Sequence, residues 1–314
     1  MKLLVTGCAG FIGANFVDYL LEKYPRDFVV GVDCLTYAAN EKALAALCLS
    51  DRFQFYKENI CNEKAIDEIF SLEKPDVVVN FAAESHVDRS IENAGIFVQT
   101  NVVGTQVLLD ASVRHGVNRF HQISTDEVYG DIQSNSVERF TENSPLRPSS
   151  PYSASKAAAD LLALSYQRTH GLSVSISRST NNYGRYQHEE KLVPRVIKKL
   201  CSGEAIPLHG DGKSVRDWLY VTDNCRAIDL VIRAGKCEIY NIGADNLWEN
   251  IKLVEQIMQL SGIPNGEIAF VEDRKGQDVK YAVCSEKIRT LGWRPEAEFT
   301  TALKETIDWY NGKR

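Results

Sequence analysis

The sequence predicts an α/β protein with a doubly wound parallel sheet and a smaller C-terminal lobe. In the first two thirds of the 314 residues, short apolar runs alternate with longer segments of helical apolar spacing. This alternation implies right-handed crossovers between parallel strands. In addition, the first apolar run leads directly into a glycine-rich segment, and the second ends in an acidic residue.

Six apolar runs are predicted strands, and four helical patterns lie between them. The run of valines at residues 77–79 is continuously apolar, as expected of a parallel strand that is buried on both faces. The strands are predicted at residues 3–6, 28–33, 53–56, 77–81, 120–124 and 174–178. The helices are predicted at residues 11–23, 63–73, 94–115 and 152–170.

The regular alternation loosens after about Asn181. Segments that contain glycine, proline and charged residues then separate shorter strands and helices. We therefore predict a cofactor-binding domain over residues 1–180. Residues 181–314 are predicted to form mainly a substrate-binding lobe, interleaved with the edge of the sheet.

Composition and charge narrow the class of protein. The net charge of −6 without a basic tract argues against nucleic acid or an anionic membrane as a partner. No apolar stretch approaches the roughly 20 residues of a membrane helix, and the first apolar run is too short for a signal peptide. The eight cysteines are scattered without a C-x-x-C pair, which favours free thiols over disulfides or a zinc site. We expect a cytoplasmic protein without a metal site.

The glycine-rich segment has the spacing G-x-x-G-x-x-G, formed by Gly7, Gly10 and Gly13. Glycine lets the backbone turn sharply and approach a pyrophosphate at the positive end of a helix. Asp33 follows Gly13 by 20 residues (33 − 13 = 20) and ends the second predicted strand. A carboxylate there can accept the ribose hydroxyls of adenosine and would repel a 2′-phosphate. Glycine spacing alone could mark only a tight turn, but the strand, helix and acid together predict Rossmann-type binding of NAD.

Tyr152 and Lys156 begin the helical pattern that follows the fifth predicted strand. Their i, i+4 spacing places phenol and ammonium on one helix face. The ammonium would lower the pKa of the phenol, so that Tyr152 could take a proton from a substrate hydroxyl. Lys156 could also hold the nicotinamide ribose. A Y-x-x-x-K pair alone is more often a surface pair, so this interpretation depends on the preceding dinucleotide loop.

Thr125, Asp126 and Glu127 directly follow the fifth predicted strand. Residues at the carboxyl end of a parallel strand face the cofactor crevice. Two adjacent acids can serve as an acid and a base if their environments separate their pKa values. The alternative is a polar loop that caps a helix, which accounts for one carboxylate better than for two.

Together these motifs resemble those of the extended short-chain dehydrogenases, and among them the dTDP-glucose 4,6-dehydratases. The resemblance includes Ser-Thr-Asp-Glu-Val-Tyr-Gly at residues 124–130 and covers essentially the whole chain. The adjacent acids are its most discriminating element, because related epimerases and decarboxylases usually lack them. Further matching segments are residues 81–90, 100–105, 181–184 and 210–220.

The resemblance implies an NAD-dependent lyase that converts dTDP-glucose to dTDP-4-keto-6-deoxyglucose. The sugar is oxidised at C4 with Tyr152 as base and Thr125 bonded to the developing ketone. Glu127 then removes the C5 hydrogen while Asp126 protonates the departing C6 hydroxyl. The hydride returns to C6, so the cofactor is regenerated in each turnover.

The resemblance also implies contact residues beyond these motifs. Arg216 is the preferred diphosphate ligand, because guanidinium binds phosphate in a bidentate manner. An ion pair of Arg216 with Asp211 or Asp217 is the alternative. The further cofactor contacts implied are Phe11, Ile12, Ile60, Ala82, Thr100 and Asn182. The substrate contacts implied, besides Thr125 and Arg216, are Ser85, Asn181, Lys191, Leu192, Pro207, His209 and Asn241.

Several residues depart from the pattern of the family. Asn59 stands where an aspartate is common, and Gln277 replaces a histidine. After residues 181–184 the family normally continues with a proline and an apolar residue, whereas this chain reads Arg185-Tyr-Gln-His188-Glu-Glu190. These positions surround the nucleotide, so the base could be that of a dTDP-, UDP- or CDP-sugar. The motifs are also compatible with an epimerase of the same fold or with a non-catalytic NAD-bound sensor.

Two helical patterns, residues 94–115 and 152–170, carry more apolar surface than one sheet-facing stripe needs. Related enzymes pair these two helices across a two-fold axis into a four-helix bundle. We therefore predict a homodimer with Leu161 or Leu164 near the interface. Alternatively, residues of the C-terminal lobe cover the additional apolar surface within one chain.

Overall fold

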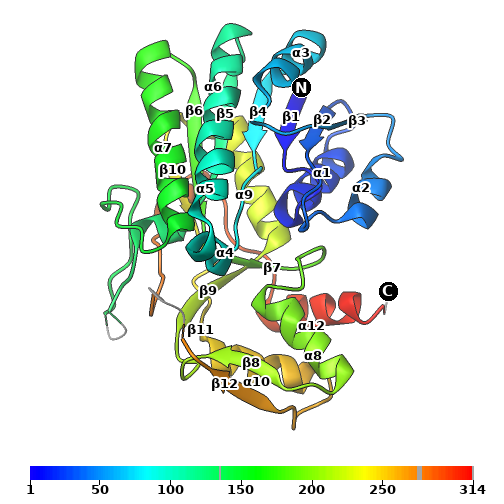
Figure 1. The fold of residues 1–314 in the computed structure, drawn as a ribbon, viewed down its shortest axis with the longest axis vertical. Helices are drawn as coiled ribbons and strands as arrows, with labels where there is room; N and C mark the ends of the chain where they lie inside the picture. The colour runs from blue at the N-terminus through cyan, green and yellow to red at the C-terminus, as the bar shows by residue number, and fades with distance from the viewer. Residues whose placement is uncertain (134–135, 274–277, 313–314) are drawn as a thin grey trace.

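The computed structural model describes residues 1–133, 136–273 and 278–312 and has a large α/β part and a smaller lobe (Figure 1). A central seven-stranded sheet has the order β10-β6-β5-β4-β1-β2-β3, and all of its strand pairs are parallel. The predicted doubly wound parallel sheet is therefore confirmed. Its strands are β1 (Lys2–Thr6), β2 (Phe28–Asp33), β3 (Phe53–Lys57), β4 (Val77–Asn80), β5 (Arg119–Thr125), β6 (Val174–Ser179) and β10 (Ile239–Ile242).

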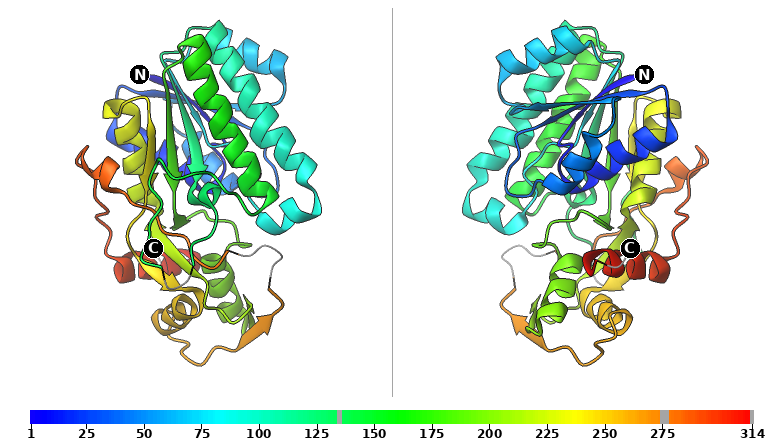
Figure 2. Two further views of the ribbon diagram at one scale, coloured as in Figure 1. Left: turned by 90° about the vertical axis from the view of Figure 1, so that its left-hand side faces the viewer. Right: turned by 90° about the vertical axis from the view of Figure 1, so that its right-hand side faces the viewer.

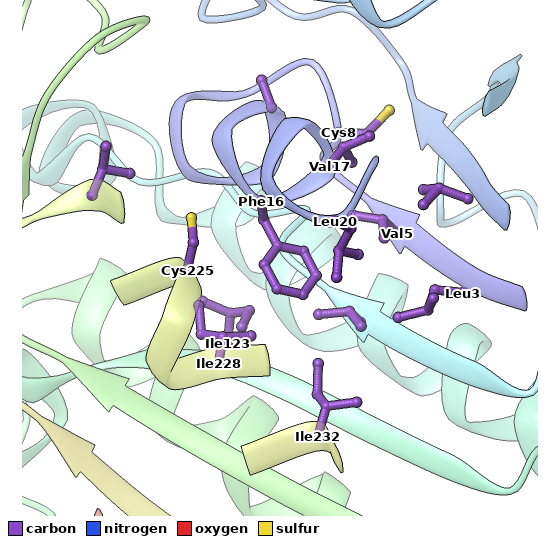
Figure 3. Packing of buried hydrophobic residues seen from close by; sticks show 14 of the residues in the cluster. Leu3, Val5, Cys8, Phe16, Val17, Leu20, Ile123, Cys225, Ile228 and Ile232 are labelled. Carbon is purple, nitrogen blue, oxygen red and sulfur yellow. The ribbon is translucent and has the colours of Figure 1, made fainter. Parts of the chain in front are cut away.

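Helices cover both faces of this sheet (Figure 2). Alternate side chains of β1 point to opposite faces, so Leu3 and Val5 join one apolar cluster and Leu4 joins the other. Figure 3 shows the first cluster, where Phe16 packs near Ile228. The first face is covered by α1 (Phe11–Lys23), α2 (Glu41–Leu47) and α9 (Val221–Ala234). The second face is covered by α3 (Glu63–Glu73), α6 (Gly104–Arg114) and α7 (Pro151–His170).

The predicted helix over residues 94–115 contains a π-helical segment. It comprises α5 (Ala94–Phe97), the π-helix η1 (Val98–Val103) and α6, and it follows the short helix α4 (Val87–Glu92). Asn101, in η1, is buried and bonds both backbone groups of Glu84. The wider turn therefore directs a polar side chain of the helix toward the loop after β4.

The smaller lobe contains two further sheets. Its three-stranded sheet has the order β11-β9-β7, formed by β7 (Asn181–Tyr183), β9 (Val215–Tyr220) and β11 (Leu247–Glu249). The two-stranded sheet pairs β8 (Ile206–His209) with β12 (Ile268–Val271). Helices α8 (Leu192–Ser202), α10 (Asn250–Leu260) and α12 (Phe299–Tyr310) bury one apolar cluster against these strands, and α11 (Glu286–Arg289) lies near β10.

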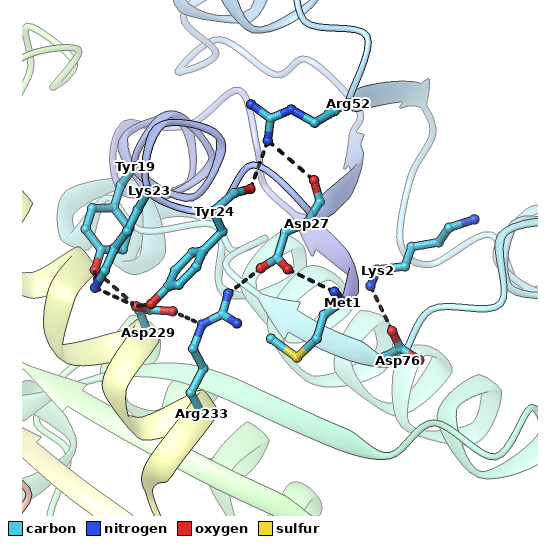
Figure 4. A network of polar contacts seen from close by, with 10 residues as sticks. All are labelled: Met1, Lys2, Tyr19, Lys23, Tyr24, Asp27, Arg52, Asp76, Asp229 and Arg233. Atoms are coloured by element: carbon cyan, nitrogen blue, oxygen red, sulfur yellow. Dashed lines mark hydrogen bonds and ion pairs between the residues drawn. The ribbon is translucent and has the colours of Figure 1, made fainter.

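A polar network joins α1 and the N-terminal strand to α9 (Figure 4). The α-amino group of Met1 lies 2.8 Å from Asp27, which also pairs with Arg233 of α9. Asp229, one turn before Arg233, accepts a 2.6 Å hydrogen bond from the Tyr24 hydroxyl. Residues 221–242 thus return from the lobe and complete the large sheet.

All eight cysteines are free thiols. Among the helices of the described residues, none combines the length and the apolar composition needed to cross a bilayer.

Candidate active site

Two adjoining cavities lie at the carboxyl ends of the central strands and extend toward the lobe. The larger measures about 500 Å³ and follows the ends of β1, β2, β4 and β5. The smaller measures about 190 Å³ and lies between the sheet edge and the lobe. Both are bordered by Ser85, Glu127, Asn181 and Lys191. In a doubly wound sheet, β1 and β4 leave a crevice at this point because their connections run to opposite faces.

The glycine loop forms the floor of the larger cavity. Gly7 has φ +66, and a Cβ atom there would lie 2.7 Å from the backbone nitrogen of Ala82. A Cβ atom on Gly13 would lie 2.2 Å from the carbonyl oxygen of Gly7. Gly10 caps α1 without a side chain, so backbone N–H groups at the positive helix end face an incoming anion.

Asp33 both borders the cavity and holds the glycine loop. Its Oδ2 accepts a 3.0 Å hydrogen bond from the Ala9 backbone, and its Oδ1 accepts a 2.8 Å bond from Leu35. Burial raises the pKa of Asp33, although these two backbone hydrogen bonds oppose the change. The carboxylate therefore sets the shape of the loop as well as presenting acceptor capacity to the cavity.

The larger cavity fits NAD on two structural grounds. The loop offers a cradle that a side chain would fill, and Asn182 Oδ1 is buried without a hydrogen-bond partner among the described residues. The structure places every residue predicted to bind the cofactor on the wall of this cavity. These are Gly7, Gly10, Phe11, Ile12, Gly13, Asp33, Ile60, Ala82, Thr100, Tyr152, Lys156 and Asn182.

The adjacent acids lie in a short 3-10 helix, η2 (Asp126–Tyr129), that follows β5. The Thr125 side chain caps this helix by accepting a 3.3 Å bond from the Glu127 backbone, so neither acid serves as the cap. Burial, and then the charge of Glu127, raise the pKa of Asp126 well above its usual range. Its Oδ2 is buried and has no partner in the described part of the chain. Asp126 is therefore suited to carry a proton at neutral pH and to donate it.

Tyr152 and Lys156 lie one turn apart on α7, opposite these acids. The Lys156 ammonium donates a 2.6 Å hydrogen bond to the Ile123 carbonyl, and burial lowers its pKa to about 8. Burial and the charge of Glu127 raise the pKa of Tyr152, while a hydrogen bond with Thr125 opposes them. The predicted lowering of the Tyr152 pKa by Lys156 is therefore wrong for the protein alone. The ammonium is hydrogen-bonded to the strand, whereas the half-buried phenol lies on the cavity wall near the carboxylate of Glu127.

The smaller cavity brings together most of the residues predicted to bind the substrate. Its wall includes Ser85, Asn181, Lys191, Leu192, Pro207, His209 and Arg216. Thr125 lies on the wall of the larger cavity beside them. The two predicted sets therefore meet at the end of β5, where the acids lie.

The side chain of Arg216 is held at the cavity wall by backbone carbonyls. It donates to Val215 at 2.8 Å and to Asp278 at 2.8 Å, and its guanidinium lies 4.3 Å from the centre of the Tyr281 ring. The two alternative ion-pair partners are engaged elsewhere. Asp211 pairs with Lys213 at 3.4 Å, and Asp217 accepts a 2.7 Å bond from Asn246.

The prediction that Asn241 contacts the substrate is wrong. Its side chain is fully buried, accepts a 2.7 Å bond from the Tyr129 hydroxyl and donates a 3.0 Å bond to Phe140, so it cannot reach the sugar. Asn250 lies on the wall of the smaller cavity instead, and its Oδ1 is buried without a partner among the described residues. Asn250 is the first residue of α10. Other cavity residues that the sequence did not predict include Gln187, Arg195, Trp218, Asp278 and Tyr281.

Two residues that depart from the family pattern, Arg185 and His188, contact segments near the larger cavity. Arg185 donates a 2.9 Å bond to Asn15 and pairs with Asp18, both on α1. His188 packs edge-on against Tyr37 with ring centres 5.4 Å apart. Arg185 is thus fastened to α1, and His188 packs against the loop that follows β2.

The other two departures lie apart from Arg185 and His188. Asn59 Oδ1 accepts a 2.9 Å bond from the Cys61 backbone, which stabilises the turn after β3. Gln277 lies outside the described residues.

Comparisons of this chain with known proteins agree on one family. The model of the family described as GDP-mannose 4,6 dehydratase matches residues 4–306. A low-salt glycan biosynthesis protein of Haloferax volcanii is 48% identical over 313 residues, or 99% of each chain. A dTDP-glucose 4,6-dehydratase of an Actinoplanes species is 46% identical over 323 residues and covers 100% of this chain and 99% of its own.

A solved structure gives the same result. The dTDP-glucose 4,6-dehydratase DesIV from Streptomyces venezuelae, crystallised with NAD bound, superimposes with a TM-score of 0.95 at 46% identity. The match covers 100% of this chain and 98% of that one. The chain therefore belongs to the family of NAD-dependent nucleotide-sugar 4,6-dehydratases that includes the dTDP-glucose 4,6-dehydratases.

Proposed function

We propose that this protein converts dTDP-glucose to dTDP-4-keto-6-deoxyglucose and water. The observation that carries the proposal is the pair Asp126 and Glu127 on the cavity wall beside Tyr152. An epimerase needs only to oxidise and reduce C4, whereas loss of water across C5 and C6 needs a base for carbon and an acid for oxygen. Two adjacent acids with different surroundings supply both.

Tyr152 acts as the base for the C4 hydroxyl, and Thr125 bonds to the developing ketone. When bound, NAD supplies a hydride acceptor and a positive charge next to these groups. Lys156 holds the nicotinamide ribose and, with its pKa near 8, remains largely protonated at neutral pH. The high pKa of free Tyr152 means that the phenol keeps its own proton until cationic groups surround it.

The acids act on the ketone that forms. The C4 ketone acidifies the C5 hydrogen, which Glu127 removes. Asp126, whose pKa is raised well above its usual range by burial, donates a proton to the C6 hydroxyl as the C–O bond breaks. The hydride that left C4 then adds to C6, and Glu127 returns its proton to C5. The proton that Tyr152 took from the C4 hydroxyl makes good the one that Asp126 gave up. Atoms and charge balance, with water as the only product besides the keto sugar.

The assignment of the dTDP-sugar rests on the relatives. Several similar curated proteins at 44–48% identity are dTDP-glucose 4,6-dehydratases. Pro207 and His209 of β8 and the buried amide of Asn250 line the smaller cavity, where a base and diphosphate would bind beside Arg216.

Purified protein should contain NAD and should remove one water from dTDP-glucose without added cofactor, because each turnover restores the cofactor. NAD is measured after denaturation, and the loss of water is measured by mass spectrometry. UDP-glucose and CDP-glucose serve as matched substrates. Faster dehydration of either would change the assigned nucleotide base of the substrate. Interconversion of C4 epimers without a change of mass would show that the protein is an epimerase and not a dehydratase.

We further propose that the protein forms a homodimer through η1, α6 and α7. Leu161 on α7 is 58% exposed, and Val98 on η1 is 50% exposed. Ala154 and Ala158 lie on the same row of α7 as Leu161, so a helix could approach closely. Leu164, the other residue predicted at the interface, packs partly against the core cluster of its own chain.

Light scattering at micromolar concentration should report twice the 35.2 kDa chain mass. Leu161→Glu should yield monomers, because a carboxylate would then lie in an apolar contact. Leu49→Glu is the matched control, since Leu49 is 88% exposed just after α2, which covers the opposite face of the large sheet. Wild-type protein that is monomeric and fully active would contradict the proposal.

A further inference from the structure

The largest fully buried side chain in the described part of the chain is an arginine, Arg178 at the end of β6. Its Nε donates a 2.9 Å hydrogen bond to Asp160 Oδ2, and both side chains are essentially inaccessible at 1% and 0% exposure. A second guanidinium nitrogen donates at 2.9 Å to the hydroxyl of Tyr129, and the guanidinium lies 4.8 Å from the centre of that ring. Neither Arg178 nor Asp160 borders either of the two cavities.

The partners of Arg178 flank the active-site residues on three elements. Asp160 lies one turn after Lys156 on α7 and accepts a 3.0 Å bond from Ser124, which immediately precedes Thr125 on β5. Tyr129 ends η2, the short helix that begins with Asp126 and Glu127. The Arg178 network therefore holds both ends of the 125–128 segment and the helix of the Tyr-Lys pair.

Stability alone gives a weak reason for this network. Removing two charges from water is costly, and apolar residues of similar volume usually serve a core equally well. The ion pair instead fixes the relative orientation of the two side chains, because guanidinium and carboxylate bond only in a narrow range of geometries. Tyr129 is held further by the 2.7 Å bond that it donates to Asn241, the residue predicted from the sequence to contact the sugar.

We propose that Arg178 and Asp160 are positioning residues that fix the Asp126–Glu127 segment relative to Tyr152 and Lys156. The inference rests on the proposed dehydration, in which both acids and the phenol must reach adjacent carbons of one sugar ring. This positioning role is a requirement for catalysis that the residues lining the cavities do not reveal. The relative placement of the two catalytic groups is set behind the site, by an ion pair that touches neither substrate nor cofactor.

Asp160 has a second effect through charge. Its negative charge counteracts the lowering of the Lys156 pKa by burial. The other charged or titratable groups around this part of the site are Tyr152 on the same helix, Asp126 and Glu127 on η2, and Arg178 on β6. Removing the negative charge of Asp160 should lower the Lys156 pKa, so the lysine loses its proton at a lower pH.

The first experiment compares Arg178→Met with Arg233→Met in the full-length, NAD-containing protein. Arg233 also forms ion pairs with aspartates, Asp27 and Asp229, but lies on α9 away from the cavities. Arg178→Met should lower kcat by about 10²-fold, as for a small misplacement of reacting groups, with little change in KM for dTDP-glucose or in NAD content. Arg233→Met should retain kcat, although its melting temperature falls.

Arg178→Met leaves Asp160 buried and unpaired, so the variant could fail to fold. The double variant Arg178→Met with Asp160→Leu avoids this, because it replaces the ion pair by an apolar pair of similar volume. It should fold with a melting temperature near that of the wild type and show the same loss of kcat. Wild-type kcat in the folded double variant would overturn the proposal.

The second experiment measures the pH dependence of kcat for Asp160→Asn, which keeps the shape of the side chain. The alkaline limb should move to lower pH relative to the wild type, a change that a purely structural defect would not cause. An unmoved alkaline limb would overturn the role of Asp160. Failure of the proposed function is recognised separately, because the wild-type protein would then release no water from any nucleotide sugar.

Discussion

Glu127→Gln and Asp126→Asn are expected to stop the loss of water while C4 oxidation continues. Both substitutions remove the group that acts on C5 or on the C6 oxygen, and general acid–base groups contribute about 10²–10⁴-fold to such steps. Mixing dTDP-glucose with a single equivalent of enzyme should therefore produce a reduced-cofactor absorbance that persists. Mass spectrometry should find no dehydrated sugar on the same time scale.

Tyr152→Phe is the matched comparison, because it removes the base for the first step and leaves both acids in place. It should suppress the absorbance change and the dehydration together. An equal loss of the absorbance change in all three variants would contradict the division of roles. Dehydration at the wild-type rate in Asp126→Asn would remove Asp126 as the proton donor, despite its raised pKa.

Asp33→Ala should weaken NAD binding by roughly 1.5–3 kcal/mol, the usual range for hydrogen bonds to a charged group. The sequence alone suggests that the stability of the fold would remain nearly unchanged. In the structure, the same carboxylate accepts hydrogen bonds from the backbones of Ala9 and Leu35. We therefore expect Asp33→Ala also to lower the melting temperature of the NAD-free protein.

Asp33→Asn separates the two effects, because an amide oxygen can still accept one backbone bond while the charge is lost. Asp33→Asn should therefore lower the melting temperature of the NAD-free protein less than Asp33→Ala does. Calorimetric titration of NAD into stripped protein gives the affinity, and thermal unfolding gives the stability. Unaltered affinity in both variants would show that the carboxylate does not contact the adenosine ribose.

The sequence predicted the central sheet well because its signals are local. A buried parallel strand is an apolar run, and a helix on its face has apolar residues every three to four positions. The predicted ends of α1 and α3 agree with the structure to the residue. The glycine loop was equally clear, since a backbone that must approach another backbone as closely as Gly7 approaches Ala82 permits no side chain.

Other features depended on contacts between distant segments. The π-helical turn η1 is defined by its backbone hydrogen bonds, which the apolar spacing of residues 94–115 does not encode, and its Asn101 contacts Glu84 in a distant loop. Asn241 and Asn250 are close to each other in the sequence. The side chain of Asn241 points into the core, whereas that of Asn250 points into the cavity. The pKa of Tyr152 could not be predicted either, because it depends on burial and on where η2 places the charges of Glu127 and Asp126.

The return of α9 and β10 to the large sheet has a consequence for synthesis of the protein on the ribosome. Phe16 and Leu20 of α1 pack in one cluster with Ile228 and Ile232 of α9, which are made more than 200 residues later. After residue 180, a further 62 residues (242 − 180 = 62) must be translated before β10 is complete. At 5–20 residues per second this takes roughly 3–12 s, during which apolar surface of the nascent chain is uncovered. The growing chain should therefore be most prone to aggregation, and most in need of a chaperone, in that interval.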